Sequence, residues 1–178
     1  MITLVVANQK GGVGKTTTAL NLAASLSAAS RKVLLIDLDS QKNASSASGV
    51  DNITSKLSLL DALVDDKPIN SLILKTDYKF DIIPASQDLI SAEMELMNAN
   101  NPTSILKEKL SVIKNKYDYL VIDCPPSLGM LSVSALRAAD KVLIPLQCEY
   151  YSLEGLAAMN QTIGEINAST GDKIKISV

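Results

Sequence analysis

Residues 10–17 read Lys10-Gly11-Gly12-Val13-Gly14-Lys15-Thr16-Thr17, a glycine-rich stretch that lies between two apolar segments. The run before it, residues 2–7, is largely apolar and predicts a buried parallel strand. Residues 18–26 repeat apolar side chains at the spacing of one helical face. The glycines therefore stand at a strand-to-helix turn, where backbone N–H groups and the helix N-terminus face one point. Such a turn favours the binding of a polyphosphate.

Each residue type in this stretch suits that chemistry. The glycines allow the backbone to approach phosphates and to adopt positive φ without a Cβ clash. Lys15 is placed to reach the β- and γ-phosphates, and the Thr16 hydroxyl to bind Mg²⁺. A glycine-rich turn that binds nothing is the alternative, and Gly-Lys-Thr between a strand and a helix argues against it. The predicted nucleotide-binding residues are Gly11, Gly12, Val13, Gly14, Lys15, Thr16 and Thr17.

The start of the loop departs from the common phosphate-binding pattern. That pattern has a glycine five positions before Gly14, where this chain has Gln9, and a second lysine, Lys10, follows. The string Lys-Gly-Gly-x-Gly-Lys-Thr-Thr resembles the deviant Walker A motif of the ParA/MinD family of ATPases. The resemblance implies that Lys10 reaches across a dimer interface to the nucleotide of the other subunit.

Two carboxylates end the next apolar run. Residues 31–39 predict a second buried strand, with Asp37 and Asp39 at its end. Acidic residues at the carboxyl end of a parallel strand lie where open α/β sheets bind ligands, although such residues also cap turns and helices. The resemblance to the ParA/MinD family implies that Asp39 orients the attacking water and that Asp37 stands in the outer shell of the metal.

A polar stretch, residues 40–48, is expected to form a loop that faces the nucleotide. The family usually has proline and glycine where this chain has Ser40 and Lys42. In the helix predicted at 86–97, the side chains of Leu89, Met94 and Met97 are expected in the core. The patterns that follow the loop predict a short helix at 57–64, a segment at 68–74, a strand at 80–85, and helices at 86–97 and 103–116.

A third apolar run, residues 117–123, ends in Asp123 and gives a Walker B pattern. Apolar strings that end in Asp are common, but this one follows a phosphate-binding loop, which makes it specific. Asp123 is therefore expected beside the Mg²⁺ that Thr16 binds. Residues 124–129 contain two prolines, cannot form a regular helix and are placed to sense the γ-phosphate, with a merely rigid turn as the alternative.

The last third of the chain continues the alternation of helix and strand. Residues 147–155 and the Asp-x-Pro-Pro-Ser-Leu string that begins at Asp123 resemble the ParA partition branch of the family. The resemblance covers essentially all 178 residues, and members of the family usually continue further. We therefore expect one P-loop ATPase domain over residues 1–178, the N-terminal part of a longer family domain that is truncated at its C-terminus. The remaining predicted elements are a helix at 131–139, a strand at 140–146, a helix at 152–168 and a strand at 173–178.

Composition excludes several classes of site. The chain has no histidine, which excludes Ser-His-Asp and Cys-His catalysis and His-ligated metals. The net charge of −2 gives no overall basic character, so binding to nucleic acid would need a local patch. No apolar run approaches the ~20 residues that span a bilayer, and no signal peptide is visible. A cytoplasmic protein without a membrane partner is expected.

These patterns predict a three-layer α/β P-loop NTPase fold with a mostly parallel sheet. They also predict that the protein binds ATP and Mg²⁺ and slowly hydrolyses ATP to ADP and phosphate. The family resemblance implies an ATP-dependent homodimer that binds DNA non-specifically, responds to a ParB-like partner and acts in chromosome or plasmid partition at the nucleoid. The alternatives are a MinD-like membrane-associated positioning ATPase, a small-molecule ligase, and an iron–sulfur carrier like the nitrogenase iron protein. The predicted catalytic residues are Lys10, Lys15 and Asp39, and the predicted metal site comprises Thr16, Asp123 and Asp37.

Overall fold

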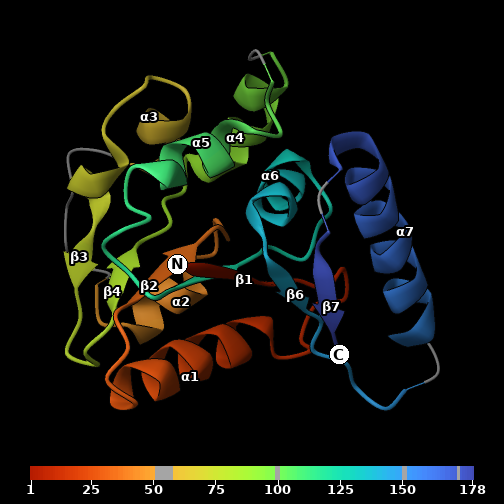
Figure 1. The fold of residues 1–178 in the computed structure, drawn as a ribbon, viewed down its shortest axis with the longest axis horizontal. Helices are drawn as coiled ribbons and strands as arrows, with labels where there is room; N and C mark the ends of the chain where they lie inside the picture. Colours follow the sequence, from red (N-terminus) through yellow and green to blue (C-terminus); the bar gives the residue numbers. More distant parts are fainter. Residues whose placement is uncertain (51–57, 99–100, 150–151, 172) are drawn as a thin grey trace.

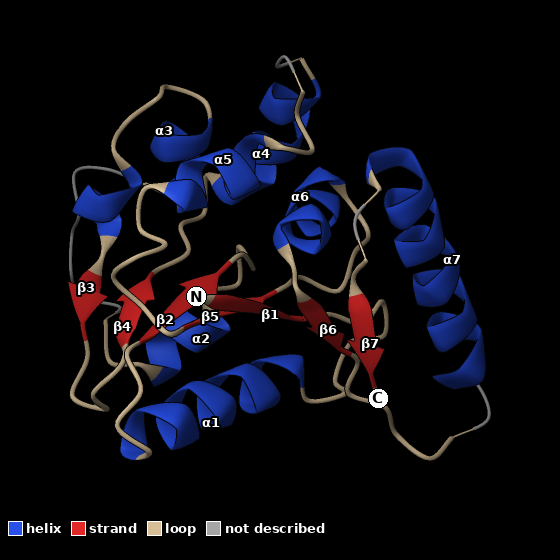
Figure 2. Cartoon of the chain, viewed as in Figure 1, coloured by secondary structure: helices blue, strands red, loops and turns tan. Residues whose placement is uncertain are grey.

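The computed structural model describes residues 1–50, 58–98, 101–149, 152–171 and 173–178. Within these residues the chain forms one seven-stranded sheet with helices on both faces (Figures 1 and 2). The strands are β1 (Ile2–Val6), β2 (Val33–Asp37), β3 (Leu74–Lys75), β4 (Asp81–Ile83), β5 (Tyr119–Asp123), β6 (Lys141–Leu143) and β7 (Lys175–Ser177). The helices are α1 (Lys15–Ala28), α2 (Asn43–Ala47), α3 (Leu59–Leu63), the 3₁₀ helix η1 (Ile69–Leu72), α4 (Leu89–Met97), α5 (Ile105–Ser111), α6 (Met130–Ala138) and α7 (Ser152–Thr170).

The strand order is β3-β4-β2-β5-β1-β6-β7, and every neighbouring pair is parallel except β3–β4. The predicted α/β class and mostly parallel sheet are therefore confirmed. Figure 1 shows α1 and α2 on one face of the sheet and α3 to α6 on the other, with α7 beside α6. No helix of the described ranges combines the length and the apolar character needed to cross a bilayer.

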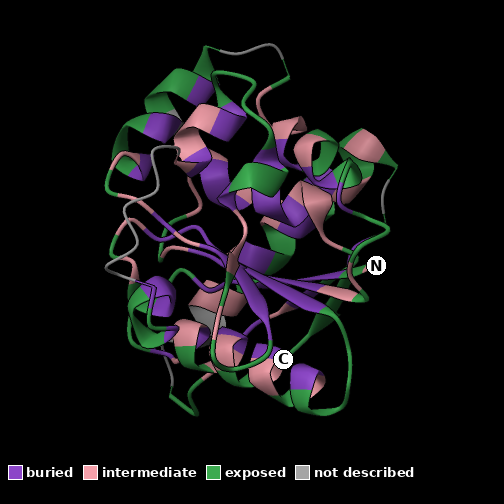
Figure 3. Cartoon of the chain, turned by 90° about the vertical axis from the view of Figure 1, so that its left-hand side faces the viewer, coloured by how far each residue is buried: buried purple, intermediate pink, exposed green. Residues whose placement is uncertain are grey.

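Alternate residues of the central strands supply two separate cores. Val5, Leu34 and Leu120 face the cluster beneath α3 to α7, whereas their sequence neighbours face the cluster beneath α1. This alternation follows from the period of two along a strand, and it explains why these strands are apolar throughout. Figure 3 shows the buried residues gathered in the strands and on the inward sides of the helices.

The middle of the chain differs from expectation in three places. The polar stretch at 40–48 contains the short helix α2, and the segment at 68–74 ends in the antiparallel edge strand β3. The expectation that Met94 and Met97 lie in the core is wrong, since they are 72% and 67% exposed. In α4 the buried positions, spaced three and four residues apart as one helical face requires, are Leu89, Ala92 and Leu96.

The sheet brings three sequence-distant segments to one edge. The register of β2 with β5 places Asp37 beside Asp123, and the register of β1 with β5 places Val6 on the other side of Asp123. The glycine-rich loop leaves β1 immediately after Val6. Both acidic strand ends therefore lie on one side of the point at which this loop begins, with Asp123 adjacent to it and Asp37 one strand further, at the carboxyl edge of the sheet.

Candidate functional site

The glycine-rich loop has the backbone that its sequence predicts. Gly12 and Gly14 adopt φ of 73° and 89°, in the left-handed region that glycine enters without a Cβ penalty. Helix α1 begins at Lys15 directly after Gly14, whose carbonyl accepts the N–H of Thr18 at 2.8 Å. The free N–H groups of the first helical turn therefore point out of the helix toward the loop, which is the arrangement that binds phosphate.

Lys15 lies inside the loop rather than in solvent. Its Nζ donates a hydrogen bond to the carbonyl of Lys10 at 3.1 Å, and the residue is 8% exposed. Burial lowers the pKa of Lys15, while the charges of Asp123 and Asp39 raise it. The backbone of the glycine-rich loop thus holds the Lys15 ammonium group at the carboxyl edge of the sheet, inside the loop.

Asp123 is fully buried, and within the described residues neither of its carboxylate oxygens accepts a hydrogen bond. Its pKa is raised to about 7, chiefly by burial and also by the nearby charges of Asp37 and Asp39. The Thr16 hydroxyl lies near enough to lower this pKa but not in hydrogen-bonding geometry with either oxygen. A buried carboxylate without a partner is costly, and a bound cation would relieve that cost.

The donor set fits Mg²⁺ held together with a nucleotide. No group of three or more His, Cys, Asp or Glu side chains in the described part of the chain is arranged to hold a metal ion alone. Mg²⁺ is commonly held by one or two protein oxygens, with phosphate oxygens and water completing its shell. Thr16 and Asp123 supply such a pair.

Asp37 has its hydrogen bonds already satisfied by the protein. Its Oδ2 accepts the N–H and the hydroxyl of Ser45 at 2.8 and 2.7 Å, and its Oδ1 accepts the N–H of Asp39 at 3.1 Å. Burial raises the pKa of Asp37, and the hydrogen bonds from Ser45 and Asp39 oppose that rise. The carboxylate therefore fixes α2, through Ser45, to the end of β2.

Ser45 is a residue that sequence reasoning missed. Besides donating to Asp37, its Oγ accepts the N–H of Ala85 at 2.9 Å, so one buried hydroxyl joins β2, α2 and the end of β4. A serine in a polar stretch carries no signal of this kind. The available signal was indirect: a carboxylate such as Asp37, expected at the end of a buried strand, needs a hydrogen-bond donor nearby.

Asp39 lies two residues beyond the end of β2 and is also buried. Its Oδ1 accepts the N–H of Gln41 at 3.0 Å, and its carbonyl accepts the N–H of Lys42 at 2.8 Å. Lys42 has a φ of 58°, in the left-handed region, at the position where the family pattern has glycine. A side chain in this conformation costs about 1 kcal/mol, so the turn keeps its shape without the glycine.

Lys10 contacts its own chain. Its Nζ forms an ion pair with Glu149 and lies 3.5 Å from Oε1 of Gln147, whose Nε2 lies 3.4 Å from the carbonyl of Gly12. The Lys10 side chain is only partly buried, with 36% of it exposed. The 147–149 segment therefore lies across the start of the loop and holds Lys10 there.

Asn8 anchors the loop and was also missed. The side chain is buried, its Oδ1 accepts the N–H of Lys10 at 3.0 Å and its Nδ2 donates to the carbonyl of Pro145 at 2.8 Å. These two bonds tie the loop after β1 to the segment after β6. A polar residue that directly follows an apolar strand was the available signal.

The loop at 124–129 borders the same edge. The N–H of Cys124 donates to the carbonyl of Val6 at 3.1 Å, so the loop leaves the sheet next to the phosphate loop. A cavity of about 210 Å³ is lined by Leu38 and Ser40 from one side and by Pro125 and Ser127 from the other. This loop therefore adjoins the segment that carries Asp39.

Comparison with known proteins agrees with this geometry. The model of the AAA_31 family, described as an AAA domain, matches residues 1–176. The chromosome partitioning protein ParA of Myxococcus xanthus is 49% identical over 176 residues, which cover 97% of this chain and 62% of that protein. The chromosome-partitioning ATPase Soj of Treponema pallidum is 45% identical over 175 residues, 98% of this chain and 68% of that protein.

The chain belongs to the ParA/Soj-like ATPases of the AAA_31 family. It spans less than two thirds of the length of the Myxococcus ParA. Among solved structures, cobyrinic acid a,c-diamide synthase from Mycobacterium smegmatis with bound ADP and magnesium superposes with a TM-score of 0.94 at 36% identity. That match covers 99% of this chain and 72% of the synthase, so proteins with differently named activities share this ParA/Soj-like fold.

Proposed function

We propose that this ParA/Soj-like chain binds ATP with Mg²⁺ at the carboxyl edge of its sheet and hydrolyses it slowly to ADP and phosphate. The observation that carries the proposal is Asp123, whose buried carboxylate lies beside Thr16 at the start of α1 and has no hydrogen-bond partner among the described residues. The name of the Treponema relative, an ATPase, supports the same reaction. Residues 1–178 would form a single P-loop ATPase domain.

The proposed roles follow from position. The N–H groups of residues 11–17 and the Lys15 ammonium hold the phosphates, and Thr16 and Asp123 hold Mg²⁺. When bound, the metal neutralises charge on the phosphate oxygens. Asp39 orients the attacking water. Asp37 acts from the outer shell, because its oxygens hold the Ser45 and Asp39 groups in place.

The second part of the proposal is a dimer switch. Two ATP-bound subunits associate face to face, and Lys10 leaves Glu149 to contact the nucleotide of the other subunit. A positive group supplied in this way to a transferring phosphoryl group contributes ~10³–10⁵ in rate in related chemistry. Loss of the γ-phosphate removes the group that both subunits share, so hydrolysis separates them.

The biological role that fits best is chromosome or plasmid partition. The ATP dimer would bind DNA non-specifically at the nucleoid in the cytoplasm, and a ParB-like partner would stimulate hydrolysis. The names of the partition relatives support this role. A small-molecule amide synthase is the second candidate, because the synthase structure matches at a TM-score of 0.94. That reaction would also need an acceptor pocket beside the nucleotide.

The decisive experiment is sedimentation of the full-length protein with non-specific duplex DNA. Samples would contain Mg-ATP, Mg-ADP or no nucleotide. Co-sedimentation only with ATP, weakened by salt, is the expected result. Binding of ATP without DNA binding in any nucleotide state would contradict partition and favour the synthase class.

Two substitutions test the dimer. Lys10→Ala should bind ATP but fail to form the ATP-dependent dimer, as measured by sedimentation velocity. Asp39→Ala should bind ATP and accumulate the dimer, because the water is no longer oriented. If Lys10→Ala dimerises like the parent, Lys10 does not contact the nucleotide of the other subunit. If Asp39→Ala hydrolyses ATP at the rate of the parent, another residue orients the attacking water.

A further inference from the structure

A cavity of about 360 Å³ lies at the opposite edge of the sheet from the phosphate loop. Its lining comes from strand starts: Lys32 precedes β2, Asp81 begins β4, and Lys116 and Tyr117 precede β5. Because these strands are parallel, their starts share the amino edge, which the nucleotide site does not touch. Lys75, the last residue of antiparallel β3, and Lys79 complete the charged lining.

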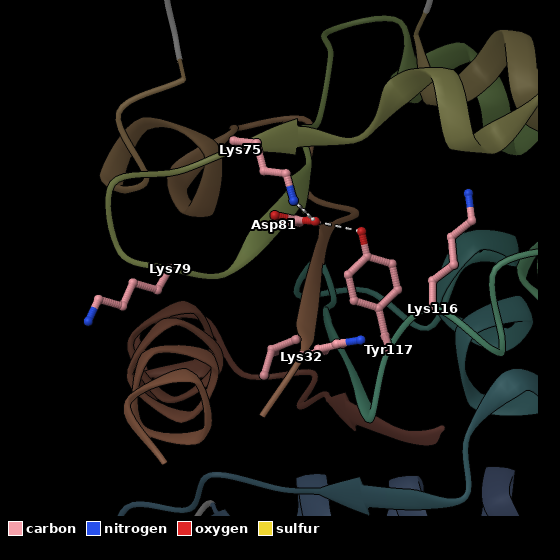
Figure 4. A pocket seen from close by; sticks show the side chains of 7 residues that line it. Lys32, Lys75, Lys79, Asp81, Lys116 and Tyr117 are labelled. Carbon is pink, nitrogen blue, oxygen red and sulfur yellow. Dashed lines mark hydrogen bonds and ion pairs between the residues drawn. The ribbon is translucent and has the colours of Figure 1, made fainter. Parts of the chain in front are cut away.

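The floor of this cavity is fixed by one carboxylate. Oδ2 of Asp81 accepts the Tyr117 hydroxyl at 2.7 Å and the Lys75 ammonium at 2.8 Å, and Figure 4 shows both side chains pointing at it. Burial raises the pKa of Tyr117, and the hydrogen bond to Asp81 and the charge of Asp81 raise it as well. The phenol therefore stays a neutral hydrogen-bond donor. The floor is therefore satisfied internally, with Asp81 offsetting the charge of Lys75.

Three further lysines surround this floor without a carboxylate partner. Lys32, Lys79 and Lys116 are exposed, and their ammonium groups form no ion pair with any described residue. In Figure 4 the ammonium groups of Lys79 and Lys116 lie on the two flanks of the cavity. The nearby carboxylate of Asp118 accepts the backbone N–H of Lys32 at 2.9 Å, so it stabilises the strand start rather than an ammonium group.

A second lysine-lined cavity, of about 410 Å³, continues along the same edge beneath β1, β6 and β7. Among the described residues its lining includes one carboxylate, Asp140, whose Oδ2 accepts the N–H of Thr3 at 2.8 Å. The lysines that line this second cavity are Lys107, Lys141, Lys173 and Lys175. Eight of the 17 basic residues therefore line the two cavities, in a chain whose net charge is −2.

We propose that this lysine edge, defined as the lysines lining the two cavities, binds the phosphate backbone of duplex DNA. The inference rests on the proposed DNA-binding function and assigns its surface. The edge runs from β3 to β7, and six strand spacings of ~4.8 Å give about 29 Å. At 3.4 Å per base pair, that length faces about eight base pairs. A row of phosphates of that length, rather than a single small anion, matches charges spread over the whole edge.

Among the described residues, every cationic side chain that lines the two cavities is a lysine, and this composition favours non-specific contact. Lysine is a point charge without the planar fork that reads guanine, so it contacts phosphates without selecting bases. Single-stranded DNA would require exposed aromatic rings for base stacking, and among the described residues the two cavities have one aromatic lining residue, the partly buried Tyr117. Since nucleotide and DNA occupy opposite edges of the sheet, both can be bound together.

The test compares two double variants of the full-length protein that remove equal charge. Lys79→Gln with Lys116→Gln changes the lysine edge, whereas Lys67→Gln with Lys109→Gln changes exposed or paired lysines outside both cavities. Fluorescence anisotropy with a 24-base-pair duplex would be measured under Mg-ATP from low to high salt. ATP binding in the same samples checks that each variant is folded.

We expect the lysine-edge variant to weaken duplex binding about tenfold near 0.1 M salt and to reduce the log–log salt slope by about 1.8, from 0.9 per lost contact. The control variant should bind like the parent. Equal loss in both variants, or none in either while the parent binds DNA, would overturn the lysine edge and leave the proposed function intact. A parent that binds no duplex in any nucleotide state would instead overturn the DNA-binding function itself.

A third arm uses tripolyphosphate as competitor. If the edge were a pocket for a small polyphosphate, micromolar tripolyphosphate would displace the duplex from the parent and bind the lysine-edge variant weakly. That result would overturn the assignment to DNA backbone. We expect displacement only at concentrations at which the added ions screen the duplex as simple salt does.

Discussion

The two edges of one sheet differ in how they hold charge. At the carboxyl edge, Asp37 and Asp123 are fully buried, and Asp37 is held by three hydrogen bonds. At the amino edge, Lys32, Lys79 and Lys116 stand in solvent on flexible stems. At the carboxyl edge the charged groups are held in fixed positions and their pKa values are shifted by burial. At the amino edge the ammonium groups are exposed and are not held in fixed positions.

This difference shows how one fold can serve two kinds of ligand. A small ligand that reacts needs groups held in place before it arrives, and burial with internal hydrogen bonds supplies that order. A polymer of repeated phosphates needs only a density of positive charge, because any register is acceptable. Substitutions at the carboxyl edge should therefore change chemistry and stability, and substitutions at the amino edge should change salt-dependent binding alone.

The largest effect is expected from Lys15→Ala. Its ammonium group is held by the Lys10 carbonyl at the point where phosphates would lie, and loss of one preorganised donor costs about 10²–10³ in rate. Single-turnover ATP hydrolysis should fall by at least that factor. Lys67→Ala, an exposed lysine far from the loop in sequence, is the matched control. Equal rates in the parent and Lys15→Ala would break the assignment of the carboxyl edge as the reactive site.

Asp123→Asn should change how stability depends on pH. Burial raises the pKa of Asp123 to about 7 from 3.8, so between about pH 4 and 7 the folded protein binds a proton that the unfolded chain has lost. The free energy of unfolding of the nucleotide-free parent should therefore fall as pH rises through that window. The Asn variant lacks this loss, and its stability relative to the parent should increase between pH 5 and 8.

Urea unfolding at the two pH values measures the Asp123→Asn effect. The pKa of Asp37, which burial also raises, contributes a slope of the same sign, but that slope is present in both proteins. The difference between variant and parent therefore isolates Asp123. A difference that stays constant from pH 5 to 8 would show that this carboxylate ionises normally when the protein is folded.

Ser45→Ala should destabilise the protein by about 1–3 kcal/mol, because Ala85 N–H would lose its acceptor and Asp37 one donor in a buried site. Urea unfolding at pH 7 measures this loss. Ser71→Ala removes an exposed hydroxyl that donates to the Pro68 carbonyl and should change little. Equal effects of the two changes would show that the buried network at the carboxyl edge adds no order.

The smallest effect on stability is expected from Glu149→Gln. The ion pair with Lys10 is exposed, and such pairs contribute about 0–1 kcal/mol. The ATP-dependent dimer should form at least as readily as in the parent, because Lys10 is no longer held in its own chain. Sedimentation velocity with Mg-ATP measures this, with Glu108→Gln as an exposed control. A dimer lost in Glu149→Gln alone would make Glu149 part of the interface itself.

The strands that end in acidic residues could be predicted from the sequence because apolar runs and their polar ends are local patterns. The positions of β1, β2 and β5 follow from such runs, as does the turn at Gly12 and Gly14. The burial of individual helix residues could not be predicted in this way, because it depends on which side of the helix faces the sheet and not on residue type alone. Met94 and Met97 are apolar, yet they face solvent because Ala92 and Leu96 define the inner side of α4.

Parts of the site depend on partners distant in the sequence. Ser45 and Ala85, or Asn8 and Pro145, meet only because the sheet orders its strands as it does, and no spacing within either segment reveals the contact. The amino edge was missed for the same reason. Its lysines are scattered from Lys32 to Lys175, and only the parallel strand starts gather them.

The central place of β1 has a consequence for the order of folding. Strand β1 pairs with β5 and β6, which follow it in the chain by more than 100 residues and begin at Tyr119 and Lys141. At roughly 5–20 residues per second, β1 waits about 6–24 s on the ribosome before its first neighbour is made. Until then its backbone and apolar side chains lack the neighbouring strands, although α1 is already available, and the Asn8 tether to Pro145 cannot close. The phosphate loop is therefore translated well before the segments that give it its final shape.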